Sequence, residues 1–564
     1  MSRVRQLGEP MRPYDASPGR LDRRSFLVLL TLGAGGSLLA ACTPPAPQAA
    51  VPAATSAPAV AAPRKGGALA IGYLQEQATL DAPVPNSDSQ ARLLNSVLDP
   101  LVWEPEPGKF VPGLAESWEI APDVKSYTLK LRKDVTFHDG AAFNAAAVKV
   151  TFDRIVDPTL KALKIGYLGP YEGTDVVDDF TVRVRFKQKF PLFLHNASTS
   201  ALRPVSPAAV QKFGADFGQN LVGTGPFKLT SFGKDKIAFD RFDAYHWAPS
   251  FLKHEGPALL DSVTYRIIPE DATRVTALER GELQIMDFTP PQEVKRLQGD
   301  QRFKVDLLNV PGLPQILQFN VDKAPTSDKL VRQACQYAVN HQDIVDNVWF
   351  SLAKPAFGVL AASTPGYWSG VEQAYPFSPE KAQALLDQAG WRLGSDGIRV
   401  KDGQRLELLY ITTATAAIVQ TGQIIQSMLR KVGVDVKIDA MANQASLTKY
   451  QQNEHHIGRL GEINSDPSVL AFPVHSRNIS GGTQGNRSRY SNPQVDKLLD
   501  DAELETDWNK RLAMYQQVQQ IVSEDAIIMG GYQQVLINAM SAKVSNVTYD
   551  ALGSPFLHAA LLEG

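Results

Sequence analysis

Adjacent histidines and acids are the residues of this chain best suited to metal binding or acid–base chemistry. His138 stands beside Asp139, and His455 and His456 follow Glu454. An imidazole oriented by a carboxylate can activate a nucleophile, and imidazoles at suitable spacing can bind zinc. His138 has neither a nearby nucleophile nor further ligands at metal spacing, which favours a structural role. Adjacent side chains point apart on helices and strands, so we expect His455 and His456 in a solvent-exposed polar loop rather than on one ion.

A glycine-rich segment and a lone cysteine are the next candidates for chemistry. Gly223-Thr224-Gly225 lacks the following Lys-Ser/Thr of a phosphate loop, so nucleotide binding is disfavoured. We expect these glycines to allow a close backbone turn where two lobes meet. Cys335 lies among apolar residues at helical spacing, which favours a core position over a reactive thiol. The sequence therefore predicts no catalytic residue, no metal and no cofactor.

The N-terminal residues predict export and attachment to a membrane. Residues 1–25 contain six arginines, and sixteen uncharged residues follow from 26 to 41, an order typical of an export signal. Arg23-Arg24-Ser25-Phe26-Leu27 resembles the twin-arginine motif, with an ordinary Sec signal as the alternative. Leu39-Ala40-Ala41-Cys42 resembles a bacterial lipobox, which implies cleavage of residues 1–42 before the cysteine and lipidation of Cys42. Residues 43–65, without aromatic side chains, are expected to form a disordered tether.

Length and charge exclude some classes of function. The formal net charge is −2 and there is no long basic run, which argues against nucleic-acid binding. Only Cys335 follows Cys42, so an intrachain disulfide in the exported chain is not expected. The 564 residues exceed what one hydrophobic core usually supports, so we expect more than one lobe.

Local patterns predict both strands and helices. Residues 127–131 and 182–186 alternate as half-buried strands do. Ser378-Pro379 predicts the start of a helix that ends before Gly390. Residues 418–431 predict a helix that stops at Gly433 and leads into a strand at 434–438. Helices followed by β-rich runs indicate α/β units in more than one lobe.

Many segments resemble family 5 of the extracytoplasmic solute-binding proteins, the group that contains the peptide, nickel and opine binders of ABC importers. The similarity is densest between Asp99 and Val148, and further segments follow in family order, so that it covers residues 70–555. The segments that carry it are Asp99-Pro100-Leu101-Val102-Trp103, Pro112-Gly113-Leu114-Ala115-Glu116-Ser117-Trp118, residues 127–140, Asn144-Ala145-Ala146-Ala147-Val148, Gly223-Thr224-Gly225-Pro226-Phe227, residues 260–266, 277–283, 318–320 and 331–334, Asp466-Pro467, and Asn492-Pro493 with Asp496.

The resemblance implies an α/β class fold, the enlarged two-lobed periplasmic-binding-protein fold (type II, cluster C-like) with an extra subdomain. Lobe I is expected at 66–108, 222–310 and 532–564, the family-specific subdomain at 109–221, and lobe II at 311–531. Two crossings near 310 and 531 would form the hinge about which the lobes close on a ligand.

The implied function is capture of a small solute in the inter-lobe cleft and its delivery to a permease. The implied partners are a small-molecule or peptide ligand, the ABC permease and ATPase, and the membrane through the lipid anchor. A monomer at the periplasmic or extracellular face of the membrane is expected. The alternatives are a secreted metal-dependent hydrolase and a ligand-sensing receptor-type binder. Peptides are the first choice of ligand, and opines, nickel chelates, modified sugars and glutathione-like thiols stay open.

Ligand-binding residues are expected where the cleft strands end. The candidates are Tyr73, Gln75, Thr224, Asn320, Glu462, Asn464, Asp466, Asn486 and Tyr490. Peptide-binding relatives often carry Trp-x-Ala-Asp-Tyr before the counterpart of Asp466-Pro467, and the Asp pairs with the α-ammonium of the peptide. Ile463 stands where that acid would be, and an apolar group cannot compensate a buried charge. Glu462 is the candidate substitute after a local shift.

Overall fold

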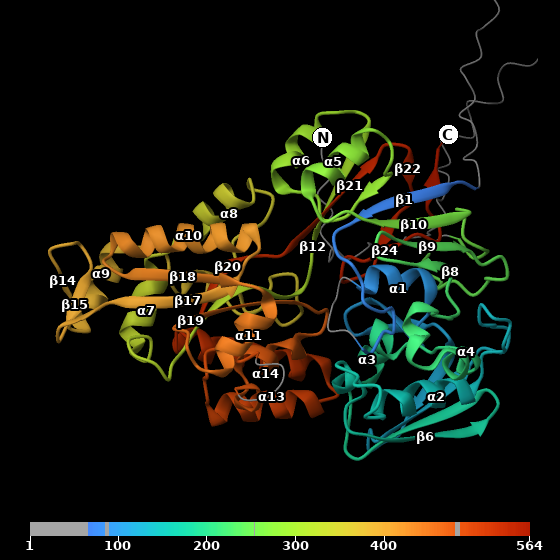
Figure 1. Cartoon of the computed structure of the whole chain (residues 1–564). Helices are drawn as coiled ribbons and strands as arrows, with labels where there is room; N and C mark the ends of the chain where they lie inside the picture. The colour runs from blue at the N-terminus through green and yellow to red at the C-terminus, as the bar shows by residue number, and fades with distance from the viewer. Residues whose placement is uncertain (1–65, 85–89, 253, 480–484, 564) are drawn as a thin grey trace, which may run out of the picture. The chain divides into compact units, whose positions relative to one another are not determined.

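The computed structural model describes residues 66–84, 90–252, 254–479 and 485–563. Figure 1 shows their course, with strands and helices interleaved along the chain. The predicted α/β class is confirmed. The predicted export signal, Cys42 and the tether lie outside the described residues. Within the described ranges, no helix has both the length and the apolar character needed to cross a bilayer.

A seven-stranded sheet draws its strands from three separate parts of the chain. β1 runs parallel to β10 and β11, and the remaining pairs are antiparallel. Its apolar side chains pack with those of three helices, α1, α5 and α6. The strands in sheet order are β12 (Phe303–Asn309), β21 (Val535–Ser541), β11 (Ile285–Met286), β1 (Ala68–Tyr73), β10 (Ser262–Ile267), β9 (Lys236–Arg241) and β8 (Phe227–Phe232), and the helices are α1 (Ala91–Val97), α5 (Asp271–Glu279) and α6 (Pro291–Gln298).

A four-stranded antiparallel sheet in the order β4-β5-β7-β6, a two-stranded sheet of β2 with β3, and several helices fill the segment between α1 and β8. The strands predicted at 127–131 and 182–186 are confirmed as neighbours, with Tyr127 opposite Val184. The elements are β2 (Val102–Glu106), β3 (Lys109–Pro112), β4 (Ala115–Ile120), β5 (Ser126–Leu131), α2 (Ala145–Val156), η2 (Ile165–Leu168), β6 (Tyr171–Asp178), β7 (Thr181–Phe186), α3 (Phe193–Ser198), η3 (Ser200–Leu202), α4 (Pro207–Phe213) and η4 (Gly214–Gln219).

A five-stranded sheet occupies the segment from β13 to β20. One apolar cluster joins this sheet to α7, α8, α9 and α10, and a second joins it to α13 and α14. The strands in sheet order are β18 (Asp435–Met441), β17 (Glu407–Thr413), β19 (Ile457–Ile463), β13 (Gly312–Phe319) and β20 (Ile528–Tyr532). The helices are α7 (Lys329–Tyr337), α8 (His341–Val348), η5 (Ser369–Gln373), α9 (Pro379–Gln388), α10 (Ala416–Lys431), α11 (Asn443–Gln451), η6 (Pro467–Leu470), α12 (Ala471–Val474), η7 (Ser476–Asn478), α13 (Pro493–Leu504) and α14 (Trp508–Glu524).

One three-stranded sheet and two strand pairs, all of short strands, complete the described elements. They are β14 (Arg392–Leu393), β15 (Arg399–Lys401) and β16 (Gln404–Arg405) in one small sheet, β22 (Val544–Ser545) with β25 (Leu561–Leu562), and β23 (Thr548–Tyr549) with β24 (Pro555–Phe556). The three larger sheets fall in the segments predicted as lobe I, the subdomain and lobe II, except that β20 extends one residue past 531, to Tyr532. The division into lobes itself stays a prediction.

Local signals placed several element ends correctly. Ser378 accepts the Lys381 backbone N–H, and α9 begins at the predicted proline. Gly390 and Gly433 follow α9 and α10 with φ of 86° and 89°, a left-handed conformation that glycine adopts without steric cost. Cys335 is fully buried, and burial raises the pKa of its thiol to about 12, which confirms its core position.

The turn at Gly223-Thr224-Gly225 packs against the end of α1. A Cβ at Gly225 would lie 2.5 Å from the carbonyl carbon of Val97, and one at Gly223 would lie 2.2 Å from the Val97 oxygen. His138 Nε2 bonds the Gly225 carbonyl over 2.9 Å, and burial lowers the pKa of this imidazole to about 4. The expected close approach is confirmed, but its partner is α1 rather than the boundary with the five-stranded sheet. His138 has the structural role that the sequence favoured.

Replacing Gly225 with alanine should therefore destabilise the protein. The new methyl group meets backbone atoms that cannot move without shifting α1, and overpacking of this kind costs about 1–3 kcal/mol. Thermal melts should show a lower midpoint for Gly225→Ala. Gly166→Ala is the matched control, because a Cβ there meets nothing within 4 Å, and it should melt at the wild-type temperature or slightly above. Equal midpoints for Gly225→Ala and wild type would contradict the packing.

Candidate functional site

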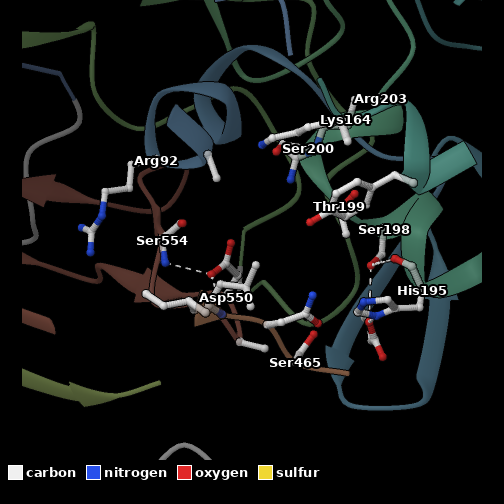
Figure 2. A pocket seen from close by; sticks show the side chains of 18 of the residues that line it. Arg92, Lys164, His195, Ser198, Thr199, Ser200, Arg203, Ser465, Asp550 and Ser554 are labelled. Carbon is white, nitrogen blue, oxygen red and sulfur yellow. Dashed lines mark hydrogen bonds and ion pairs between the residues drawn. The ribbon is translucent and has the colours of Figure 1, made fainter. Parts of the chain in front are cut away.

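A cavity of about 310 Å³ is lined by residues from all three sheet regions. Its walls come from the ends of β1, β2 and β19, from α1 and α3, and from the C-terminal segment around Asp550. Figure 2 shows polar side chains directed at this space from several elements. Charged members of the lining are Arg92, Glu104, Lys164, His195, Arg203 and Asp550. A concave site with a few convergent polar groups is typical of small-ligand pockets.

Glu104 and His195 form a buried pair on one wall. His195 Nδ1 and Glu104 Oε2 are 2.6 Å apart, and both side chains are at most 7% exposed. Glu104 Oε1 also accepts the Gly108 backbone N–H over 2.7 Å. Burial acts to lower the pKa of His195, but the charge and hydrogen bond of Glu104 outweigh it and the pKa is raised. The pair thus favours an imidazolium at the cavity wall.

Asp550, Asn95 and Arg203 form a second polar group. Asn95 donates to Asp550 Oδ2 over 3.1 Å and accepts from Arg203 Nη2 over 2.7 Å. The guanidinium of Arg203 also donates to the Leu98 carbonyl over 2.8 Å and lies 5.4 Å from the centre of the Trp103 ring. Burial lowers the pKa of Arg203 to about 10, while the charges of Asp550 and Asp99 oppose that shift. This group carries both signs of charge on one side of the cavity.

The end of β19 and the loop after it provide another part of the wall. Ile463, Asn464 and Ser465 line the cavity and carry no charge. Behind them, Asp466 is 2% exposed and forms two hydrogen bonds, of 2.6 and 2.8 Å, with the guanidinium of Arg511. Burial would raise the pKa of Asp466, but the charges of Arg511 and then His195 outweigh it and lower the pKa to about 2. The pair therefore stabilises the loop that shapes this wall.

Two of the nine predicted ligand-binding residues line the cavity. These are Gln75, just after β1, and Asn464, just after β19, both at strand ends as expected. Asp466 is the immediate neighbour of this wall, but its carboxylate is bonded to Arg511. Tyr73 is fully buried, with its ring 5.9 Å from that of Tyr265. Ligand contacts of Gln75 and Asn464 stay predictions, now supported by their position.

The other five predicted residues lie outside the cavity lining. Thr224 is buried and donates to Asp99 Oδ2 over 3.0 Å. Asn320 is buried and donates to the His455 carbonyl over 2.9 Å. Glu462 is half-buried within β19, opposite Leu313. Their binding roles stay predictions that the cavity does not support.

Asn486 and Tyr490 belong to one buried turn. Asn486 Nδ2 donates to the Tyr490 carbonyl over 2.8 Å, and its Oδ1 accepts the Tyr490 backbone N–H over 3.2 Å. The Tyr490 hydroxyl donates to Asp525 over 2.5 Å, and its ring packs in the cluster beneath α13 and α14. Both side chains are therefore used to hold the loop before α13.

The expectation of a solvent-exposed loop at His455 is wrong. His455 is 1% exposed, and its Nε2 lies 2.6 Å from the Arg487 carbonyl, because the chain turns inward to start β19. His456 is half-buried, accepts the Leu409 backbone N–H over 2.9 Å and lies 3.1 Å from the Ala324 carbonyl. Both imidazoles thus bond backbone groups. In the part of the chain that the structure describes, no three or more His, Cys, Asp or Glu side chains are grouped to hold a metal ion.

Sequence reasoning missed all six charged residues of the lining. His195 follows the apolar Phe193 and Leu194, and Arg203 follows Ala201 and Leu202. A charged residue inside an otherwise apolar stretch is a signal of a buried, paired charge, and that signal was present at both positions. Glu104 and Asp550 had no comparable signal, since each is flanked by residues that suit an exposed strand or turn equally well.

Comparison with known proteins gives consistent results. Residues 109–482 match the model of the bacterial extracellular solute-binding proteins, family 5 Middle. The glutathione-binding protein GsiB of Pectobacterium atrosepticum is 30% identical over 446 residues, which are 78% of this chain and 83% of that protein.

Solved structures share the fold. NikA from Brucella suis, solved in complex with Fe(III)-EDTA, has a TM-score of 0.79 at 26% identity and covers 88% of this chain and 100% of its own. DppA from Helicobacter pylori, solved with the peptide STSA, has a TM-score of 0.74 at 26% identity. The match covers 89% of this chain and 99% of the DppA chain. These similarities confirm the predicted two-lobed periplasmic-binding-protein fold.

Replacing Asp466 with asparagine tests whether this residue acts through structure. Removing one partner of a buried ion pair leaves the Arg511 charge uncompensated and costs about 3–5 kcal/mol, so the thermal midpoint at pH 7 should fall by several degrees. The pKa is depressed from 3.8 to about 2, so the pair stabilises the fold fully above pH 4 and loses this effect as the pH falls through 2. The difference in midpoint between wild type and variant should shrink over the same interval.

Asp396→Asn is the matched control for this experiment. Asp396 pairs with Arg405 at the surface, where both side chains are about half exposed, and its loss should change the midpoint little. An unchanged midpoint for Asp466→Asn, together with weaker solute binding, would instead make Asp466 a ligand-binding residue.

Proposed function

We propose that this chain captures a peptide-like solute in the 310 Å³ cavity. The premise is that it belongs to family 5 of the bacterial extracellular solute-binding proteins and is the solute-binding protein of an ABC importer. The observation that carries this proposal is the composition of the cavity wall. One side comes from the seven-stranded sheet region and α3, and the other comes from the end of β19 in the five-stranded sheet. A solute in this space touches both.

The path of the chain supports closure around the solute. Within the described residues, the chain passes from the seven-stranded to the five-stranded sheet between β12 and β13, and returns between β20 and β21. Two adjacent crossings can act as a hinge by absorbing modest changes in φ and ψ. A solute that contacts both sides stabilises the closed form by its difference in affinity for the two forms. The permease and ATPase would then receive the solute unchanged.

The size and polarity of the cavity favour a small peptide-like solute. Its volume lies at the lower end of the 300–1,000 Å³ typical of ligand pockets, which suits a few residues rather than a long oligopeptide. Relatives named as binding glutathione, and a structural neighbour solved with a four-residue peptide, are consistent with this class. We propose a short peptide or a glutathione-like molecule as the solute.

Sequence features outside the described residues support the location. The lipobox-like Leu39-Ala40-Ala41-Cys42 and the twin-arginine-like segment at 23–27 favour an exported chain anchored through lipid on Cys42. The family is extracytoplasmic, in agreement with export. We propose a monomer tethered at the outer face of a cell membrane.

Two alternative functions, a metal-dependent hydrolase and a receptor-type binder, make different predictions. The hydrolase required free imidazoles, whereas His455 and His456 bond backbone groups in the structure. A receptor-type binder that only senses its ligand would share the fold and the cavity. A permease and an ATPase encoded beside this gene would favour transport over sensing.

Native mass spectrometry of protein purified from its host, compared with a cavity-blocking variant, tests solute binding. Wild type should carry one small molecule per chain, recovered with unchanged mass. Thr199→Trp places a large ring at the cavity wall and should lose the retained mass, with affinity for the identified solute at least about tenfold weaker. Thr448→Trp, on the exposed face of α11, should retain the solute as wild type does. Retention by Thr199→Trp, or a solute recovered chemically altered, would contradict the proposal.

Replacing Cys42 with serine tests the anchor. Serine cannot form the thioether that attaches the diacylglycerol, so metabolic labelling with a radioactive fatty acid should be lost and the protein should leave the membrane fraction. Cys335→Ala, which removes the other cysteine from the core, should keep the label. Labelling of Cys42→Ser would show that the chain is not anchored through this residue.

A further inference from the structure

The oppositely charged side chains of Asp550 and Arg203 are both hydrogen-bonded to the side-chain amide of Asn95. Asn95 Nδ2 donates to Asp550 Oδ2 over 3.1 Å, and Asn95 Oδ1 accepts from Arg203 Nη2 over 2.7 Å. Asp550 and Arg203 both line the cavity, and both are labelled in Figure 2. The Asn95 amide, which has a donor and an acceptor on one carbon, thus bridges the Asp550 carboxylate and the Arg203 guanidinium.

Arg203 keeps hydrogen-bond donors that no described residue accepts. Its side chain is buried, Nη1 donates to the Leu98 carbonyl over 2.8 Å, and Nη2 donates to Asn95. A guanidinium has five N–H donors. Nε has no partner but is itself buried, so the donors left for a ligand are the second N–H groups of Nη1 and Nη2. Among the residues that the structure describes, no carboxylate forms an ion pair with Arg203. A buried cation with unused donors at a cavity wall is suited to an anion within the cavity.

Asp550 keeps an acceptor on the same side. Its Oδ1 accepts the backbone N–H groups of Leu552 and Ser554 over 3.0 and 2.8 Å, whereas Oδ2 accepts only from Asn95. An ionised carboxylate offers about four acceptor positions, so Oδ2 has room for a further donor. Burial raises the pKa of Asp550, which means that its charge is incompletely compensated by the donors present. A cationic donor in the cavity would supply that compensation.

We propose that Asp550 and Arg203 bind an α-amino-acid head group, with an ammonium and a carboxylate on one carbon, at one end of the solute. The ammonium donates to Asp550 and the carboxylate accepts from Arg203, in the same polarity as the amide of Asn95. This proposal rests on the proposed solute-binding function and names the chemical class of solute. γ-Glutamyl compounds and free amino acids carry such a head group, whereas an ordinary α-linked peptide presents only an ammonium at its N-terminus.

A zwitterion satisfies both residues, and simpler ions do not. A lone amine would leave the donors of Arg203 unmet, and a lone carboxylate would leave Asp550 uncompensated and would approach a like charge. The part of the wall formed by Ile463, Asn464 and Ser465 carries no charged side chain. The other charged lining residues already have interactions within the protein, since Glu104 pairs with His195, Arg92 pairs with Asp287 over 3.1 Å, and Lys164 also has a partner. We therefore assign the recognition of a zwitterion to Asp550 and Arg203.

Two isomeric tripeptides provide a direct test. Glutathione (γ-Glu-Cys-Gly) and α-Glu-Cys-Gly contain the same atoms, but only the γ-linked isomer has the free ammonium and carboxylate on one carbon. Calorimetric titration of ligand-free, full-length protein should give at least about tenfold tighter binding of glutathione than of its isomer. Asp550→Asn keeps the acceptor for the two backbone N–H groups and should remove most of this preference. Asp243→Asn, with a side chain 81% exposed, should preserve it.

Further variants and ligands distinguish the proposed head-group site from the more general proposal that the cavity binds a solute. Arg203→Lys keeps the positive charge and should retain part of the preference, and melting curves show whether each variant is folded. Equal affinity of wild type for the two isomers, or a preference that survives in Asp550→Asn, overturns the proposal. If wild type binds neither glutathione nor γ-Glu-Leu, the proposal is also overturned. In that case, a solute retained in native mass spectra would still uphold the proposed function, and an empty protein would reject both.

Discussion

Two chain crossings that lie side by side are the constraint on which the rest of the structure depends. The Val310 backbone N–H donates to the Gln534 carbonyl over 3.2 Å, the Gln315 amide donates to Gln534 Oε1 over 3.1 Å, and the Gln534 amide donates to the Leu313 carbonyl over 2.8 Å. These bonds join the outgoing and returning segments to each other. The crossings therefore fix which strand ends face the cavity, while leaving few covalent connections to resist a rotation of one sheet relative to the other.

Beside these crossings, the cavity wall contains buried charges whose partners are supplied by the protein. Glu104 with His195, and Asp466 with Arg511, are close pairs that need no solute. Their geometry holds α3 and the loop after β19 as the walls, because a buried charge without its partner costs several kcal/mol. Arg203 differs, because its guanidinium lines the cavity and bonds the Leu98 carbonyl and the Asn95 amide, but forms no ion pair with a carboxylate among the described residues. This contrast separates the residues that shape the site from those suited to bind a guest.

The sequence predicted elements whose causes are local and missed contacts that arise from tertiary packing. The cap at Ser378 and the helix ends before Gly390 and Gly433 depend on neighbouring residues, and all three are confirmed. Family order of the motifs gave the fold, which the solved structures confirm. His455 was misplaced because a polar run does not show that the backbone turns inward at β19. Arg203 and Asp550 lie 347 positions apart in the numbering, and only the fold brings them to one cavity.

The central claim is that one solute, held unchanged, contacts walls from both sheets. The most direct test is a crystal structure of the protein with the solute that it retains from its host. The account predicts an intact small molecule that touches Asn464 or Ser465 on one side and the wall containing Arg203 and Asp550 on the other. A solute bound to one sheet region alone, or present as a reaction product, would contradict it.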